Sequence, residues 1–158
     1  MISRTLMAMD LKEGQFSKDD QVEPFFYEVL EPLAQCMYRA YLNSPEFEGE
    51  KEEDFLEELH QVLRGLYGEF MPKASFVLSD KDKILAAHLV CLYKNVPTTT
   101  YLFTDPDYRR QGLATSVLEA SCHTLTKESY PKIQVYLNLD NQGAYQLYDS
   151  FGFNEQSF

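Results

Sequence analysis

Residues 108 to 118, with the sequence YRRQGLATSVL, place two arginines, a glycine and an alanine where a turn opens a helical pattern. The first N–H groups of a helix lack intrahelical acceptors, and the helix dipole adds partial positive charge at that end. Such a start is a natural binding site for a phosphate. Gly112 and Ala114 let a large group approach the backbone, while Arg109 and Arg110 add positive charge. We therefore expect an anion-binding turn here.

This turn fits neither of two common phosphate-binding motifs. It lacks the G-x-G-x-x-G of dinucleotide-binding turns, and it lacks the G-x-x-x-x-G-K-[ST] of nucleoside-triphosphate-binding loops. What remains is R-x-x-G-x-A, formed by Arg109, Gly112 and Ala114. A pattern this short needs the support of a second motif.

The second motif is NQGAYQLYDSFGF, which runs from Asn141 to Phe153. Asn141 stands directly before a helical pattern, a position typical of an N-cap. Tyr148 is a phenol that can donate a proton. Its helical spacing beside Leu147 and Phe151 is also typical of a tyrosine in a hydrophobic core.

Together the two motifs resemble the GNAT superfamily of acyl-CoA-dependent N-acetyltransferases. The family's [RQ]-x-x-G-x-[GA] element matches at Arg109, Gly112 and Ala114, and its N-x-x-A-x-x-L-Y-x-x-x-G-F element matches at every fixed position from Asn141 to Phe153. The resemblance implies that acetyl-coenzyme A is the co-substrate and that a primary amine accepts the acetyl group. It does not specify the amine, which can belong to a small molecule, a peptide or a protein.

The resemblance also implies roles for individual residues. Backbone N–H groups of the turn would bind the coenzyme A pyrophosphate, and main-chain groups on the preceding strand would hold the pantetheine arm and polarise the thioester carbonyl. Asn141 would contact the cofactor through its side chain. The residues implied to bind the cofactor are Phe103, Thr104, Asp105, Arg109, Arg110, Gln111, Gly112, Leu113, Ala114, Thr115 and Asn141.

Tyr148 matches the family's general acid. Attack of an amine on a thioester expels a thiolate, which a nearby phenol can protonate, and such proton transfer typically contributes ~10² to 10⁴ in rate. The alternative is a non-catalytic coenzyme-A-binding or regulatory domain of the same fold. We expect the enzyme, because both Asn141 and Tyr148 are present.

The base that removes the proton of the amine is not specified by either motif. A lysine-like amine has a pKa of roughly 10.4, so its deprotonation at pH 7 costs ~4 to 5 kcal/mol. The candidates are Asp105, His88 and the acids that precede Phe55. A histidine on a strand is more often a packed core residue, and Asp105 precedes Pro106 and can simply shape the turn.

The hydrophobic periodicity predicts the elements that position these motifs. Helical spacing runs from residue 25 to 41, with a break between Val29 and Pro32, and again from 55 to 70. Further helices are predicted to follow the turn and Asn141. The predicted strands are 4–10, 74–80, 83–95, 98–106 and 132–140. We expect one mixed α/β domain over residues 1–158, with a central, mostly antiparallel GNAT-like sheet, about four flanking helices and a truncated C-terminal end.

Composition and charge limit the partners. The net charge of −11 argues against nucleic acid, whose phosphates require a basic surface. Residues 46–58 carry eight carboxylates, which are either a solvated helix face or an acidic lip that gathers amines. The sequence shows neither a signal peptide nor an apolar run long enough to span a membrane. Its three cysteines and three histidines have no metal-binding spacing, so we expect reduced thiols, a cytoplasmic protein and no metal.

The C-terminal end departs from the family pattern. Only NEQSF follows Phe153, whereas the family normally adds two further strands, one of which pairs with the strand equivalent to 132–140. An unpaired edge there would be apolar at Ile133, Val135 and Leu137. We expect this edge to be covered by the tail, by a second subunit or by a further segment of a longer native protein, and favour a homodimer.

Overall fold

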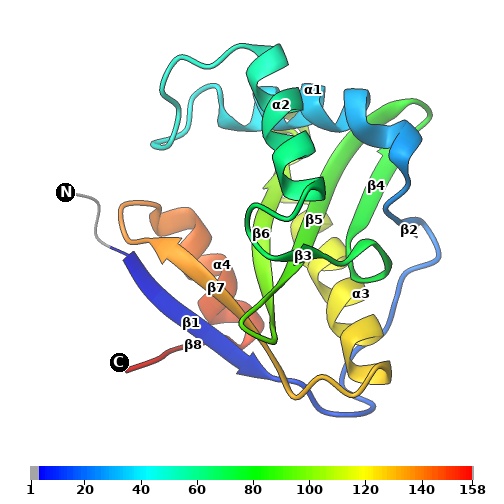
Figure 1. Ribbon diagram of the computed structural model, residues 1–158, viewed down its shortest axis with the longest axis vertical. Coiled ribbons are helices and arrows are strands. Elements are labelled where there is room, and N and C mark those ends of the chain that lie inside the picture. The colour runs from blue at the N-terminus through cyan, green and yellow to red at the C-terminus, as the bar shows by residue number, and fades with distance from the viewer. Residues whose placement is uncertain (1–3, 158) are drawn as a thin grey trace.

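One eight-stranded sheet organises the computed structural model, which describes residues 4–157 (Figure 1). Its strands run in the order β2-β4-β5-β6-β7-β1-β8, and β3 pairs with β5 outside this path. The strands are β1 (Arg4–Asp10), β2 (Val22–Pro24), β3 (Glu69–Phe70), β4 (Phe76–Asp80), β5 (Lys83–Tyr93), β6 (Val96–Thr104), β7 (Lys132–Asn138) and β8 (Asn154–Glu155). The helices are α1 (Leu30–Tyr41), α2 (Glu52–Leu63), α3 (Leu113–Lys127) and α4 (Gln142–Phe151). The mixed α/β class is confirmed.

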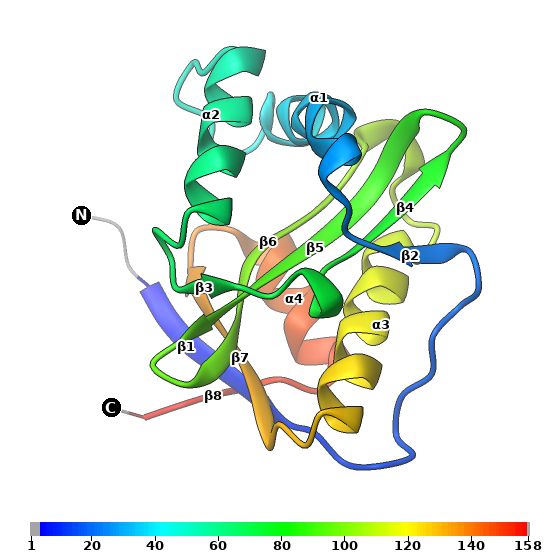
Figure 2. The same cartoon turned by 45° about the vertical axis from the view of Figure 1, so that its right-hand side comes forward.

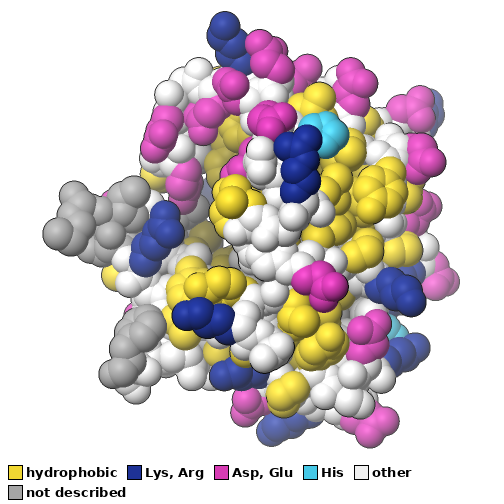
Figure 3. Space-filling model, viewed as in Figure 1, with side chains coloured by type: hydrophobic (Ala, Val, Ile, Leu, Met, Phe, Trp, Pro, Cys, Tyr) yellow, Lys and Arg dark blue, Asp and Glu magenta, His cyan; other side chains and the backbone are white. Residues whose placement is uncertain are grey.

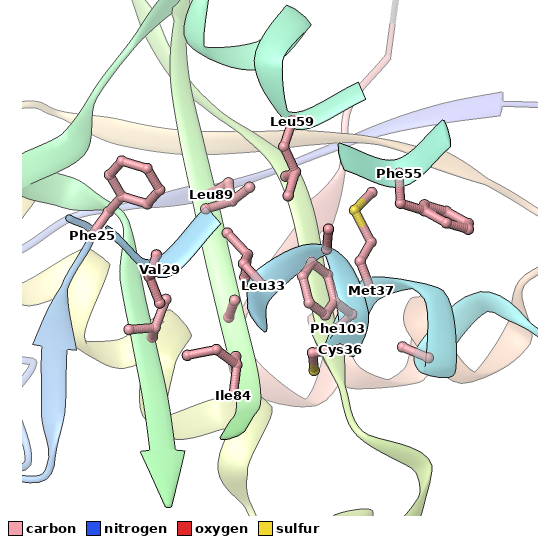
Figure 4. Packing of buried hydrophobic residues seen from close by; sticks show 14 residues of the cluster. Phe25, Val29, Leu33, Cys36, Met37, Phe55, Leu59, Ile84, Leu89 and Phe103 are labelled. Carbon is pink, nitrogen blue, oxygen red and sulfur yellow. The ribbon is translucent and has the colours of Figure 1, made fainter. Parts of the chain in front are cut away.

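Two helices cover each face of the sheet (Figure 2). On one face, Leu33 and Met37 of α1 and Leu59 of α2 form a buried cluster with strand residues (Figure 4). The other face buries side chains of α3 and α4 against β1, β4, β5 and β7. Within residues 4–157, no helix is both long enough and apolar enough to cross a membrane.

Both predicted helices of the first half are shorter than their apolar patterns. The break before Pro32 is confirmed: a 3-10 turn ends at Val29, and Pro32 lies in the first turn of α1, where its missing N–H costs no helical hydrogen bond. The second prediction was wrong at its end. The helix stops at Leu63, and Phe70 belongs to β3. Positive φ angles at Gly65 and Gly68 carry the chain out of the helix.

The strands β6 and β7 form the sheet's only parallel pair among the described residues, and they separate almost at once. They pair only at Thr98 with Gln134 and Thr99 with Val135. Leu89 and Val90 are neighbours on β5, and their partners on β6 are Tyr101 and Thr99. Thr100, between these partners, is therefore the extra residue of a bulge. A bulge bends its strand and increases its twist. The bulge therefore coincides with the point where the two strands diverge, and Figure 1 shows β6 and β7 running apart.

The edge of β7 is covered by the chain's own N-terminal strand. Every residue of β1 pairs antiparallel with β7, from Arg4 opposite Asn138 to Asp10 opposite Lys132. The tail pairs with β1 instead, through β8. The three occupants that we expected at this edge, the tail, a second subunit and a further segment, were therefore wrong. The physical reason to expect a homodimer at this edge is removed with them.

A buried polar network joins β5, β6 and α3. The His88 side chain is fully buried, with Nδ1 at 2.7 Å from Ser121 Oγ and Nε2 at 2.8 Å from Thr99 Oγ1. Burial lowers the pKa of His88 to about 3, so the imidazole is neutral at pH 7. Both ring nitrogens are hydrogen-bonded and the side chain has no exposed surface, so His88 has a structural role in the core. It is excluded as the base that deprotonates the acceptor amine.

This network makes the stability depend on pH in a defined window. Unfolded His88 takes up a proton below pH ~6.5, whereas the folded ring does so only near pH 3. Stability contributed by this group is therefore lost as the pH falls from 6.5 to 3. Between pH 7 and pH 5 we expect a loss of about 2 kcal/mol in the free energy of unfolding. Urea unfolding at both pH values measures it, and His88→Gln should abolish most of the difference. An equal pH dependence in parent and variant would contradict the assignment.

Candidate active site

The turn before α3 presents free backbone donors. Among the described residues, none of the N–H groups from Arg110 to Thr115 donates to another part of the chain, and the first such bond is Ser116 N–H to Gly112 C=O. Arg110 and Gly112 have positive φ angles of 65° and 76°, which turn successive N–H groups toward one concavity. A Cβ added at Gly112 would meet nothing within 4 Å, so the space before the turn is open. The geometry fits an anion.

The two arginines of the turn differ in their surroundings. Arg109 donates from Nη2 to the Ala40 carbonyl at 3.2 Å, close to the C-terminus of α1, where a cation also complements the helix dipole. Arg110 is exposed. Arg109 thus ties the turn to α1, while Arg110 remains available to a ligand.

A cleft of about 580 Å³ begins at this turn. Phe103 and Thr104 of β6 line it, as do Asn141 and Tyr148. Beyond Thr99, the groups of β6 that face β7 have no ladder partner among the described strands. Of the cofactor residues expected from the sequence, those lining the cleft are Phe103, Thr104, Arg109, Arg110, Gly112, Leu113, Ala114, Thr115 and Asn141. Gln111 is exposed beside it.

Asp105 lies outside the cleft lining, and its polar groups are used within the fold. Its N–H donates to Leu85 C=O at 2.8 Å, and its buried carboxylate accepts from Arg39 Nε at 2.7 Å. Burial opposes ionisation, but the Asp107 N–H and the Arg39 guanidinium hold the pKa of Asp105 below its usual 3.8. Asp105 therefore anchors α1 to the end of β6. It is excluded both as a cofactor contact and as the base.

Asn141 is the N-cap of α4. Its Oδ1 accepts from the Ala144 N–H at 3.0 Å. Its Nδ2 donates to Oε1 of Glu46 at 3.0 Å. The N-cap role is thus confirmed, and the amide also holds a carboxylate of the loop between α1 and α2.

Tyr148 lies where the first cleft meets a second one. Its side chain is 4% exposed, packs edge-on against Phe153 with ring centroids 5.2 Å apart, and lines both clefts. Burial raises the pKa of Tyr148 well above its usual 10. The phenol is therefore protonated at neutral pH.

The second cleft, of about 1220 Å³, is acidic. Its charged lining residues are Arg4, Glu46, Glu48, Glu50, Asp54, Glu58, Lys94 and Asp140. Figure 3 shows Asp and Glu side chains gathered over α2 and the loop before it. Most of the acidic residues in 46–58 thus face a cleft, although Glu52, Glu53 and Glu57 are exposed outside its lining. The cleft favours a cationic occupant.

Sequence reasoning missed one structured carboxylate in this cleft. Oε2 of Glu58 accepts hydrogen bonds from the hydroxyl of Tyr67, at 2.7 Å, and from that of Tyr101. Burial, followed by the hydrogen bond to Glu58, raises the pKa of both phenols, so both stay protonated as donors. The three residues come from separate elements, and no spacing in the sequence links them. Among residues 4–157, no group of three or more metal-binding side chains occurs.

Comparison with known proteins places this geometry in a family. Residues 33–153 match the Acetyltransferase (GNAT) family. The ribosomal protein bS18-alanine N-acetyltransferase of Escherichia coli K12 is 32% identical over 81 residues, which are 51% of this chain and 55% of that protein. The chain therefore matches only about half the length of this curated relative.

Solved structures agree with the fold. The Escherichia coli ribosomal-protein-S18-alanine N-acetyltransferase has a TM-score of 0.65 at 25% identity, covering 86% of this chain and 78% of that one. An N-acetyltransferase from Thermoplasma acidophilum in complex with coenzyme A has a TM-score of 0.70 at 14% identity, covering 87% and 91%. The family match extends over most of the chain and includes both motifs, which confirms the resemblance. This chain belongs to the GNAT acetyltransferase family.

Proposed function

We propose that this chain is an N-acetyltransferase that moves the acetyl group of acetyl-coenzyme A to a primary amine, with Tyr148 as general acid. The observation that carries the proposal is the meeting of two clefts at Tyr148. One cleft begins at a turn of free N–H groups, and the other is lined by carboxylates. An anionic co-substrate and a cationic acceptor can therefore reach the same phenol.

The residues of the first cleft fit coenzyme A. N–H groups from Arg110 to Thr115 would bind its pyrophosphate, with Arg110 adding charge. Main-chain groups of Phe103 and Thr104, beyond the last pairing of β6 with β7, would hold the pantetheine arm. The Thermoplasma acidophilum N-acetyltransferase of the same fold, solved with coenzyme A, supports this use of the cleft.

Acetyl-coenzyme A supplies the acetyl thioester, and the chain supplies the proton transfers. Tyr148 keeps its proton at neutral pH and donates it to the departing sulfur, which would otherwise leave as a thiolate. The carboxylates of the second cleft attract the protonated amine.

Two measurements test the function as a whole. Saturating acetyl-coenzyme A at a hundred times its dissociation constant should stabilise the fold by ~2.7 kcal/mol, seen as a rise in the melting temperature. Thiol release with a panel of primary amines then separates the enzyme from a coenzyme-A-binding or regulatory domain. The panel should include lysine, spermidine, an aminoglycoside and a peptide with a free N-terminal alanine. Binding without turnover on any amine would favour the regulatory domain.

Gly112→Gln should weaken coenzyme A binding at least tenfold, because the new side chain fills the open space before the turn. The matched control is Gly14→Gln. Gly14 also has a positive φ, 78°, and open space around its added Cβ, so the backbone strain is similar. Calorimetric titration with coenzyme A measures both. Equal affinity in Gly112→Gln and the control would show that the turn does not hold the pyrophosphate.

Tyr148→Phe removes the hydroxyl and keeps the ring that packs on Phe153. We expect kcat to fall by ~10², with coenzyme A affinity nearly unchanged. Steady-state kinetics and calorimetry on the same preparation separate the two effects. Turnover within a few-fold of the parent would make the hydroxyl dispensable and assign the proton donor elsewhere.

A further inference from the structure

The loop between α1 and α2 places Glu46 at the junction of the two clefts. The residues that line both clefts are Tyr41, Pro45, Glu46, Leu102, Asn141, Ala144 and Tyr148. Glu46 carries the only carboxylate in this set. Tyr41 and Tyr148 are the other titratable residues of the set; Tyr148 keeps its proton at neutral pH, and the pKa of Tyr41 is raised by burial and then by Glu46 and Glu58. Tyr41 therefore stays protonated, and Glu46 is the group at the junction that can accept a proton.

Glu46 is held through one oxygen. Its Oε1 accepts from Asn141 Nδ2 at 3.0 Å, and Asn141 in turn accepts from the Ala144 N–H as the N-cap of α4. The carboxylate thus lies beside the N-terminus of α4. Tyr148 stands about two turns further along the same helix, on the same face as Asn141. One helix therefore positions both the phenol and the carboxylate.

The other oxygen of Glu46 has no partner. Oε2 is buried and forms no hydrogen bond with any described residue. A buried carboxylate oxygen without a donor is costly, and an N–H donor in the cleft removes that cost. Glu58 differs, because two phenols already donate to its Oε2. Among the candidate bases, His88 and Asp105 are committed to the fold.

We propose that Glu46 is the catalytic base that receives the proton of the acceptor ammonium. This inference rests on the proposed N-acetyltransferase function. The ammonium donates to Oε2 and passes one proton to the carboxylate, which leaves a neutral amine with a free electron pair. As the C–N bond forms, the C–S bond breaks, and its electron pair leaves on sulfur, which takes the proton of Tyr148. The new amide nitrogen gives its surplus proton back to the Tyr148 oxygen, and Glu46 releases its proton to water.

Glu46→Gln tests the base, because glutamine keeps an oxygen for Asn141 and cannot accept the proton. We expect kcat/KM for lysine-type amines to fall about 10²-fold. Glu53→Gln is the matched control, since Glu53 is exposed, belongs to the same acidic run and lines neither cleft. The control removes the same charge and should stay within about twofold of the parent.

Acceptors of different basicity sharpen the test. An α-amino group has a pKa of about 7.7 to 8.0, against roughly 10.4 for a lysine side chain, so it needs less help to lose its proton. Glu46→Gln should therefore slow a peptide α-amine less than a lysine-type amine, and raising the pH should restore activity. Coenzyme A affinity by calorimetry and the melting temperature should match the parent.

The possible failures are distinguishable. Turnover by Glu46→Gln within threefold of the parent, at every pH and with every amine, overturns Glu46 as the base and leaves the proposed function intact. A loss that is equal for all amines and insensitive to pH also overturns it, in favour of an effect on packing. If the parent itself binds acetyl-coenzyme A but acetylates no amine, the proposed function fails and this inference fails with it.

Discussion

The bulge at Thr100 is the constraint on which the rest of the structure depends. Parallel strands paired along their full length would leave no space between β6 and β7. Because the extra residue bends β6, pairing ends at Thr99 and Val135, and the strands part. Side chains of α4 and of the loop after α1 then occupy the junction, so Tyr148 lines both clefts. Beyond the bulge, the backbone groups of β6 that face β7 lack a strand partner, although those that face β5 stay paired. Buried peptide groups are stable only when something pairs with them. The cleft beside β6 is therefore suited to a ligand that offers hydrogen bonds.

Three contacts fix α1 and the loop that follows it against the sheet and the two motifs. Arg39 pairs with the buried Asp105 at the end of β6, and Arg109 of the turn bonds to the C-terminal part of α1. Glu46 of the loop is held by Asn141. Each contact joins the first third of the chain to a residue of the sheet or of a motif. Arg109 and Asn141 therefore both line the cleft and hold its walls together. Asp105 lies outside the cleft lining, and its contacts serve the fold.

Positive and negative charge around the junction come from different elements of the fold. N–H groups and the dipole of α3 make the turn attractive to an anion, whereas the loop before α2 and the helix itself present carboxylates to the second cleft. At physiological ionic strength such fields fade over about 8 Å in water, but they persist where side chains exclude solvent. The first cleft therefore favours an anionic ligand and the adjacent second cleft favours a cationic one. Tyr148 lies at the boundary.

The amino-acid sequence alone determined the features that depend on near neighbours along the chain. The turn from Arg110 to Thr115, the N-cap at Asn141 and the strand at 4–10 could be predicted because glycine conformations, capping and alternation are local. Only the tertiary structure decided which strand covers β7, because the pairing of β1 joins opposite ends of the chain. It also decided that His88 and Asp105 are structural and that one oxygen of Glu46, Oε2, is left without a hydrogen bond among the described residues. Glu46 and Asn141 are 95 residues apart in sequence, and whether a carboxylate in an acidic run is solvated, paired or left with a free oxygen depends on which elements pack around it.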